Sequence, residues 1–195
     1  MSKYIYVSTD VETDGPIPGP NSMLSFGSVA LDVSNLSDLR ECEISSFSAN
    51  LELLPDASPD PETQHFWSDN AEAYAMTRVD ARPPREALGM YSAWLRSLPG
   101  TPVFVGYPAT FDFMFVHWYL IKFTGSDPYG FQGLDMKSYA SALLGNDFKK
   151  TKKESMPKRW FRHCQPHNHV AIDDAREQGL IFLSMYKEST ARKKS

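Results

Sequence analysis

The distribution of apolar and polar residues divides the first third of the chain into three strand-like stretches. Residues 3–9 and 23–33 are rich in Val, Ile, Tyr and Phe, and a Gly/Pro-rich cluster at 14–22 separates them. Residues 43–53 place apolar side chains at nearly every second position, which is the period of a strand with one buried face. We therefore predict a three-stranded antiparallel meander.

The apolar period becomes helical after the Pro-rich stretch that follows the third strand. Residues 61–77 begin with a proline, a residue favoured at the first helical position, and residues 85–98 carry apolar side chains at helical intervals. TPVFVGY (101–107) is a nearly all-apolar run of strand length, and the aromatic-rich segment 111–123 has the length of a helix. This part of the chain is predicted to be two helices, a buried strand and a third helix.

The remaining sequence predicts a short strand near 130–134, a helix at about 135–144 and a long helix from Asn168 to Tyr186. The order of elements is then βββα followed by βαβα. Such an order indicates an α/β domain with a mixed sheet, three antiparallel strands followed by parallel ones, flanked by helices.

Length and composition are those of one compact domain. Of the 195 residues, 42% are hydrophobic, which suffices for a sizeable core. We place this domain at residues 1–188 and treat 189–195 as a short basic tail. No window is apolar for the length of a membrane span, and the isolated Cys42 and Cys164 lack the spacing of a disulfide framework. We expect a cytoplasmic protein without a membrane partner.

Charge is unevenly distributed along the chain. The net charge of −4 argues against a protein that coats long duplexes through bulk positive charge. It does not exclude a nuclease, because carboxylates gathered around cations add to the negative total. Residues 149–162 nevertheless form a basic segment in which Glu154 is the only acid. This segment either holds phosphates of an incoming strand or is a solvated loop, and the sequence favours neither.

Asp10 and Glu12 lie two residues apart at the end of the first predicted strand. Side chains with this spacing project from the same face of a strand, so two carboxylates would point at one place. Such a pair repels itself unless cations neutralise it, and Mg²⁺ and Mn²⁺ prefer oxygen ligands. An Asp-x-Glu triplet also occurs on ordinary surfaces, so the pair needs further residues to support a metal site.

Asp112 is the second candidate and lies in a segment that is otherwise almost free of charge. A lone acid just after an apolar strand is costly to bury unless a partner or a cation compensates it. The alternative is an acid at a helix start that interacts with the positive end of the helix dipole.

His169 and Asp174 form the third candidate, at the beginning of the last predicted helix. Five positions correspond to roughly 500° of rotation, which leaves the two side chains about 140° apart on an ideal helix. They cannot share one helical face. We therefore expect His169 on the loop or first turn, Asp174 on the helix itself, and Asp173 directed elsewhere.

The blocks STDVET, FDFMF and HVAIDDA, in this order, resemble the three signature blocks of the DEDDh exonucleases. These are ribonuclease H-like enzymes that include polymerase proofreading subunits, ribonuclease T and oligoribonuclease. The resemblance covers nearly the whole chain, and PETQHFW (61–67) further resembles a bacterial and phage branch described as exoribonuclease-like. The matching site positions are Asp10, Glu12, Asp112, His169 and Asp174.

The resemblance implies a 3′-5′ exonuclease that uses two Mg²⁺ or Mn²⁺ ions about 3.5–4 Å apart. Asp10 would bridge both ions, Glu12 and Asp174 would complete the site that activates water, and Asp112 would support the second ion. An imidazole titrates near neutral pH, so His169 would be the general base. The products would be nucleoside 5′-monophosphates.

The resemblance also suggests where the substrate binds. Thr13 and its backbone would meet the 3′-terminal nucleotide, and Phe66 or Trp67 would stack on a base, although core packing of both rings is an equal alternative. The region before Asp112 reads GYPATFD, where many relatives have a His-Asn pair, so contacts there differ. We expect short or single-stranded 3′ ends as substrate, with RNA somewhat favoured over DNA, and a homodimer because relatives are often dimeric.

Three other readings remain open at this point. A catalytically silent nucleic-acid-binding domain would keep the fold but lose site residues, and all five are present. A non-haem iron oxygenase needs two histidines and a carboxylate on one face, and no second histidine fits. His163, Cys164 and His167 are of the types that bind zinc, but no second pair completes such a site.

Overall fold

The computed structural model describes residues 3–162, 164 and 168–192 and contains a five-stranded sheet with the order β3-β2-β1-β4-β5. The strands are β1 (Tyr4–Thr13), β2 (Met23–Leu31), β3 (Glu43–Asn50), β4 (Thr101–Gly106) and β5 (Gly133–Asp135). β2 is antiparallel to both β1 and β3, whereas β4 is parallel to β1 and to β5. The predicted mixed sheet is confirmed.

Helices connect the strands in the predicted order. They are α1 (Pro61–Asp69), α2 (Ala71–Arg78), α3 (Pro84–Ser97), α4 (Ala109–Thr124), α5 (Met136–Leu144) and α6 (Ala171–Arg192), with short 3₁₀ turns η1 (Leu39–Cys42), η2 (Phe148–Lys150), η3 (Lys153–Ser155) and η4 (Lys158–Phe161). The single helix predicted at 61–77 is two helices. Asn70 divides them because its backbone N–H bonds to Trp67 and its side-chain amide bonds to Phe66.

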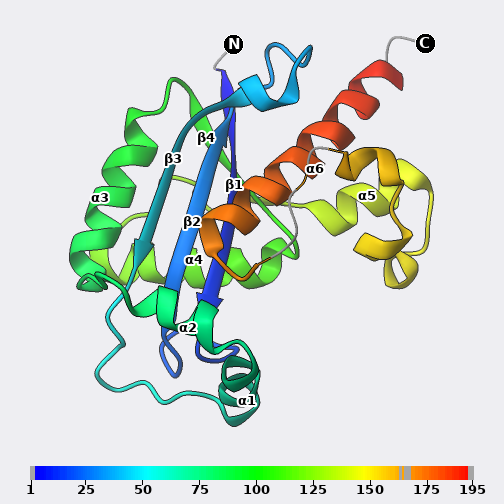
Figure 1. Ribbon diagram of the computed structural model, residues 1–195. Helices are drawn as coiled ribbons and strands as arrows, with labels where there is room; N and C mark the ends of the chain where they lie inside the picture. The colour runs from blue at the N-terminus through cyan, green and yellow to red at the C-terminus, as the bar shows by residue number, and fades with distance from the viewer. Residues whose placement is uncertain (1–2, 163, 165–167, 193–195) are drawn as a thin grey trace.

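The sheet separates two hydrophobic cores, with α3 and α4 on one face and α6 on the other (Figure 1). One core joins Ile5 of β1 to Tyr91 of α3 and Phe115 of α4. The other joins Val29 of β2 to Phe182 of α6. All five side chains are at most 1% exposed, and burial of each stabilises the fold by about 1.5–3 kcal/mol. The central strands are buried on both faces, which explains their nearly continuous apolar sequence.

The last helix, Ala171–Arg192, extends beyond its predicted end. The guanidinium of Arg192 donates to the backbone carbonyl of Leu143 at 2.6 Å and to Glu188 at 2.7 Å, which holds the final turn against α5. The first part of the predicted basic tail is therefore helical, and residues 193–195 lie outside the described residues. None of the helices in the described ranges is long and apolar enough to cross a membrane.

Candidate active site

The Asp10–Glu12 pair lies near the C-terminal end of the central strand β1, on the side of the molecule where α1 and α2 are found (Figure 1). Glu12 is buried and Asp10 is half-buried. The Oδ1 atom of Asp10 accepts a hydrogen bond of 2.6 Å from the side-chain amide of Gln178 on α6. The start of α6 therefore faces the same part of β1 from which the two carboxylates project.

Gly27 allows α6 to approach the sheet this closely. It pairs with Asp10 in the β1–β2 register, and a Cβ atom at this position would lie 2.4 Å from both the backbone N and the Cα of Ile172. Any side chain here would collide with the backbone of the helix. The absence of a Cβ atom at Gly27 thus brings the first turn of α6 to the carboxylates of β1.

Glu12, His169 and Asp174 each offer a potential ligand atom, and these atoms all lie within 4.8 Å of one another. Asp174 projects from the first turn of α6 and is 1% exposed. His169 precedes the helix and has a φ of 57°, in the left-handed region that is uncommon for residues other than glycine. The structure thus has His169 on the loop and Asp174 on the helix, as predicted from their spacing.

Asp112 lies in the first turn of α4 and is 3% exposed. Its Oδ2 atom is buried and makes no hydrogen bond within the described part of the chain. Burial raises the pKa of the Asp112 carboxyl to about 8, and the negative charge of Glu12 adds to the increase. A buried, unsatisfied carboxylate oxygen next to a second carboxylate fits a divalent cation, whose positive charge would favour the ionised form.

No protein-family model matches the chain. The chain is 31% identical over 202 residues to the 3′-5′ DNA exonuclease Cap18 of Escherichia coli, a match that covers 98% of this chain and 96% of that protein. The fold of this chain is similar to that of the nuclease domain of 3′hExo, a DEDDh family member solved bound to rAMP. The TM-score is 0.64, with 11% identity over 96% of this chain and 92% of the other. The chain belongs to the DEDDh 3′-5′ exonucleases.

Two other solved structures have a similar fold. S. pombe Pop2p, in a form with bound Mg²⁺ and Mn²⁺, matches with a TM-score of 0.65 and 14% identity over 93% of this chain and 82% of its own. E. coli Exonuclease I in complex with a dT13 oligonucleotide matches with a TM-score of 0.68 and 14% identity over 98% of this chain and 42% of its own. The predicted family, ribonuclease H-like fold and enzyme class are confirmed. The readings as a silent domain or an iron oxygenase are not retained.

A pocket of about 440 Å³ opens in this exonuclease beside Glu12 and Thr13. Phe66, which also lines it, is 40% exposed, and its ring centroid lies 5.1 Å from that of His169. Trp67 reaches the pocket but is only 6% exposed, and its indole N–H donates to the backbone carbonyl of Thr13 at 2.8 Å. Phe66 therefore offers a partly exposed ring at the site, whereas Trp67 chiefly holds the backbone of Thr13.

Gln178 is a site residue that the sequence analysis did not identify. It is 2% exposed, and its amide reaches Asp10 from the helical turn that follows Asp174. The four-residue spacing between Asp174 and Gln178 puts both on one face of α6, a signal that the sequence contained. Without the fold, however, nothing linked this face to β1.

The zinc reading has no support within the described residues. The only group of three potential metal ligands found there is the one formed by Glu12, His169 and Asp174. Cys164 is half-buried, and burial raises the pKa of its thiol to about 11, away from the thiolate form that binds metal. His163 and His167 lie outside the described residues.

Replacing Gly27 with Ala should both destabilise the exonuclease and lower its activity. The added methyl group must push the start of α6 away from β2, which we expect to cost about 1–3 kcal/mol and to move His169 and Asp174 away from Glu12. Melting temperature and mononucleotide release measure the two effects. Gly89→Ala is the matched control, because no atom lies within 4 Å of a Cβ at that helical position. Equal behaviour of both variants would contradict this account of the α6 packing.

Proposed function

We propose that this exonuclease uses two divalent cations, Mg²⁺ or Mn²⁺, to hydrolyse the last phosphodiester bond at a single-stranded 3′ end and to release a nucleoside 5′-monophosphate. The observation that carries the proposal is the convergence of Glu12, His169 and Asp174 within 4.8 Å of one another. Asp112 and Asp10 complete the acidic surroundings from α4 and β1. A homodimer and a cytoplasmic location stay predictions.

The acidic residues fit the cations that the mechanism requires. Asp10, Glu12, Asp112 and Asp174 would hold them, because hard cations take carboxylate oxygens and relieve the repulsion among them. When bound, such ions lower the pKa of water and stabilise the negative charge that develops on the leaving oxygen. The related fold of Pop2p, solved with Mg²⁺ and Mn²⁺, supports this choice of metals.

His169 is proposed to accept the proton of the attacking water. One imidazole nitrogen lies within 4.8 Å of a carboxylate oxygen of Glu12 and of one of Asp174, so it would be close to a water bound at these carboxylates. The 3′-terminal nucleotide would occupy the pocket of about 440 Å³ that is lined by Thr13 and Phe66. Phe66 would then stack on the terminal base next to the histidine.

DNA is our proposed substrate. The sequence analysis somewhat favours RNA, and the structures with a similar fold include one solved with rAMP and one solved with dT13. The relative that matches 98% of the chain, however, is a DNA exonuclease by its name. This likeness extends over 98% of the chain, whereas the resemblance to an exoribonuclease-like branch covers only residues 61–67.

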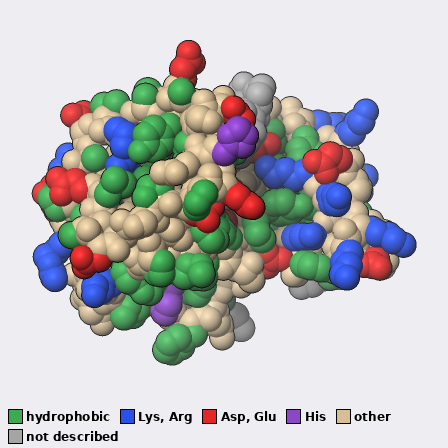
Figure 2. All heavy atoms as spheres, turned by 90° about the horizontal axis from the view of Figure 1, so that it is seen from below, with side chains coloured by type: hydrophobic (Ala, Val, Ile, Leu, Met, Phe, Trp, Pro, Cys, Tyr) green, Lys and Arg blue, Asp and Glu red, His purple; other side chains and the backbone are tan. Residues whose placement is uncertain are grey.

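The basic segment would guide the rest of the strand. Lys and Arg side chains gather on the lobe formed by α5 and η2–η4, across from the acidic and His side chains near the centre of the same face (Figure 2). Lys149, Lys150 and Lys152 are exposed, and Lys137 lies over the half-exposed ring of Phe148 at 4.6 Å. We call these five residues the DNA-strand surface. Lysines next to an exposed ring suit a single strand, with phosphates on the cations and a base on the ring.

Arg159 and Lys153 of the same basic segment have other partners. Arg159 makes two hydrogen bonds of 3.0 and 2.9 Å to Glu188, and Lys153 lies 3.1 Å from Glu177. Both glutamates belong to α6, so these cations attach the lobe to the helix. Arg159 and Lys153 are therefore not included in the DNA-strand surface.

Matched, end-labelled DNA and RNA oligonucleotides test the proposed function. We expect mononucleotide release that requires Mg²⁺ or Mn²⁺ and stops when EDTA removes them. A 3′-phosphate should protect the oligonucleotide, whereas a 5′ block should not. We expect kcat/KM to be about tenfold or more higher for DNA, and KM for long strands should rise with salt as lysine–phosphate contacts weaken.

Several outcomes would contradict parts of the proposal. Simultaneous products of many internal lengths would indicate an endonuclease. Faster hydrolysis of RNA would overturn the substrate class but not the exonuclease. Undiminished release in EDTA would overturn the metal assignment.

A further inference from the structure

Asn168 ties the loop that carries His169 to the beginning of α6. Its side-chain amide donates to Asp173 at 3.0 Å, and its Oδ1 atom accepts from the backbone N–H of Val170 at 3.0 Å. Its own backbone N–H donates to the Oδ1 atom of Asp174 at 3.3 Å. Asn168 therefore contacts residues that follow His169 in the chain, one of which is a proposed metal ligand.

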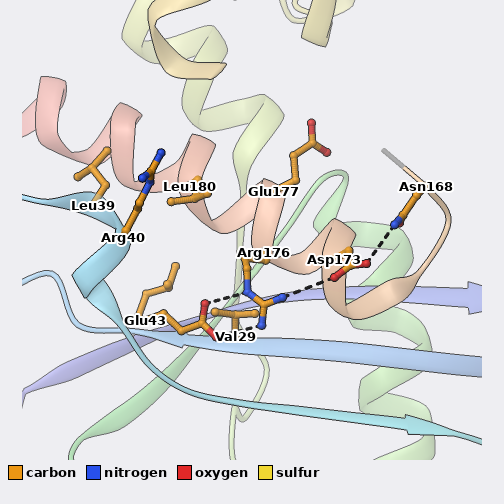
Figure 3. A pocket seen from close by; sticks show the side chains of 10 residues that line it. Val29, Leu39, Arg40, Glu43, Asn168, Asp173, Arg176, Glu177 and Leu180 are labelled. Atoms are coloured by element: carbon orange, nitrogen blue, oxygen red, sulfur yellow. Dashed lines mark hydrogen bonds and ion pairs between the residues drawn. The ribbon is translucent and has the colours of Figure 1, made fainter. Parts of the chain in front are cut away.

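A chain of ion pairs continues from this loop to the first residue of β3 (Figure 3). Arg176 Nη1 lies 3.5 Å from Asp173 Oδ1. On its other side, Arg176 Nε and Nη2 donate to the two carboxylate oxygens of Glu43 at 2.9 and 3.1 Å. Glu43 begins β3 and Arg176 belongs to α6, so the contacts join the sheet to the beginning of the helix that carries Asp174.

A pocket of about 590 Å³ lies at this place between α6, η1 and the sheet. Val29, Leu39 and Leu180 contribute apolar lining, and Arg176 extends from α6 toward Glu43 within it (Figure 3). Packed side chains do not fill the space. The polar chain through Arg176 therefore links the first turns of α6 to β3 along this surface pocket.

The conformation of His169 makes this link important for the site. A φ of 57° is uncommon for residues other than glycine, so contacts with the surroundings help to hold His169 in this conformation. Asn168, through its contacts with Asp173 and Val170, supplies part of this enforcement. Arg176 in turn restrains Asp173 from the side of the sheet.

We infer that Arg176 is a positioning residue, which with Glu43 holds Asp173 and Asn168 so that His169 points at Glu12 and Asp174. The inference rests on the proposed function of His169. The side chains of Arg176 and Asp173 are 40% and 48% exposed, and ion pairs with such exposure contribute little to stability. Loss of Arg176 should therefore affect turnover more than the melting temperature.

Arg176→Gln tests this role in the 195-residue chain. We expect kcat on a single-stranded DNA oligonucleotide to fall about 10- to 100-fold, because small displacements of catalytic groups cost this much. KM and Mn²⁺ affinity should change by less than about twofold. Arg176→Lys keeps the charge but loses the two-pronged contact, so its kcat should lie between those of Arg176→Gln and the wild type. Combined with His169→Ala, Arg176→Gln should cause no further loss, because both changes act through the same side chain.

Arg159→Gln is the matched control. It removes another two-pronged Arg–Glu contact to α6, the one with Glu188, and should leave kcat unchanged. An equal loss of kcat in Arg159→Gln would overturn the inference, as would an undiminished effect of Arg176→Gln in the His169→Ala background. If His169→Ala itself keeps normal kcat, the proposed function of the histidine fails instead, which separates the two conclusions.

Discussion

Replacing Asp10 with Asn should lower mononucleotide release by about 10³-fold or more, because the cations that Asp10 would help to hold would contribute several kcal/mol of transition-state stabilisation. The substitution keeps the size of the side chain and an oxygen that can still accept the hydrogen bond from Gln178. The local structure should survive, and the loss should reflect the missing charge.

The measurement combines Mg²⁺- and Mn²⁺-dependent turnover with the melting temperature. Glu41→Gln serves as the control, since it also removes one negative charge but from an exposed position on η1. Near-normal turnover of Asp10→Asn at saturating metal would show that Asp10 is not a cation ligand. A large fall in melting temperature would show that the carboxylate of Asp10 is mainly structural.

His169→Ala should lower kcat by about 10²- to 10⁴-fold while metal binding largely survives, because the side chain is proposed to take a proton and not to hold an ion. Raising the pH should partly restore the rate, since hydroxide then replaces the missing base. Rates as a function of pH, together with Mn²⁺ affinity, measure the two effects.

His163→Ala and His167→Ala are the controls for His169→Ala, because both histidines precede it closely in the sequence. If either variant is as damaging, the histidine has been assigned to the wrong position. Loss of metal affinity in His169→Ala would instead make His169 a ligand, a role for which its distance to Glu12 and Asp174 is also short enough. The proposed proton transfer would then be wrong.

The sequence by itself determined the features that depend on local periodicity. Alternation marked the third strand, helical spacing marked α3, and the two-residue spacing put Asp10 and Glu12 on one face of a strand. The rotation per residue of a helix also separated His169 from Asp174, and the structure has one on the loop and the other on α6. Such features need no knowledge of which elements later meet.

Only the tertiary structure decided which residues of distant segments meet at the site. Gln178 reaches Asp10 across 168 positions, and Arg176 reaches Glu43 across 133 positions. These contacts exist because α6 packs on the sheet over Gly27, an approach that no local pattern encodes. Burial is equally non-local: Phe66 and Trp67 are adjacent aromatic residues of α1, yet packing buries Trp67 and leaves Phe66 40% exposed beside His169.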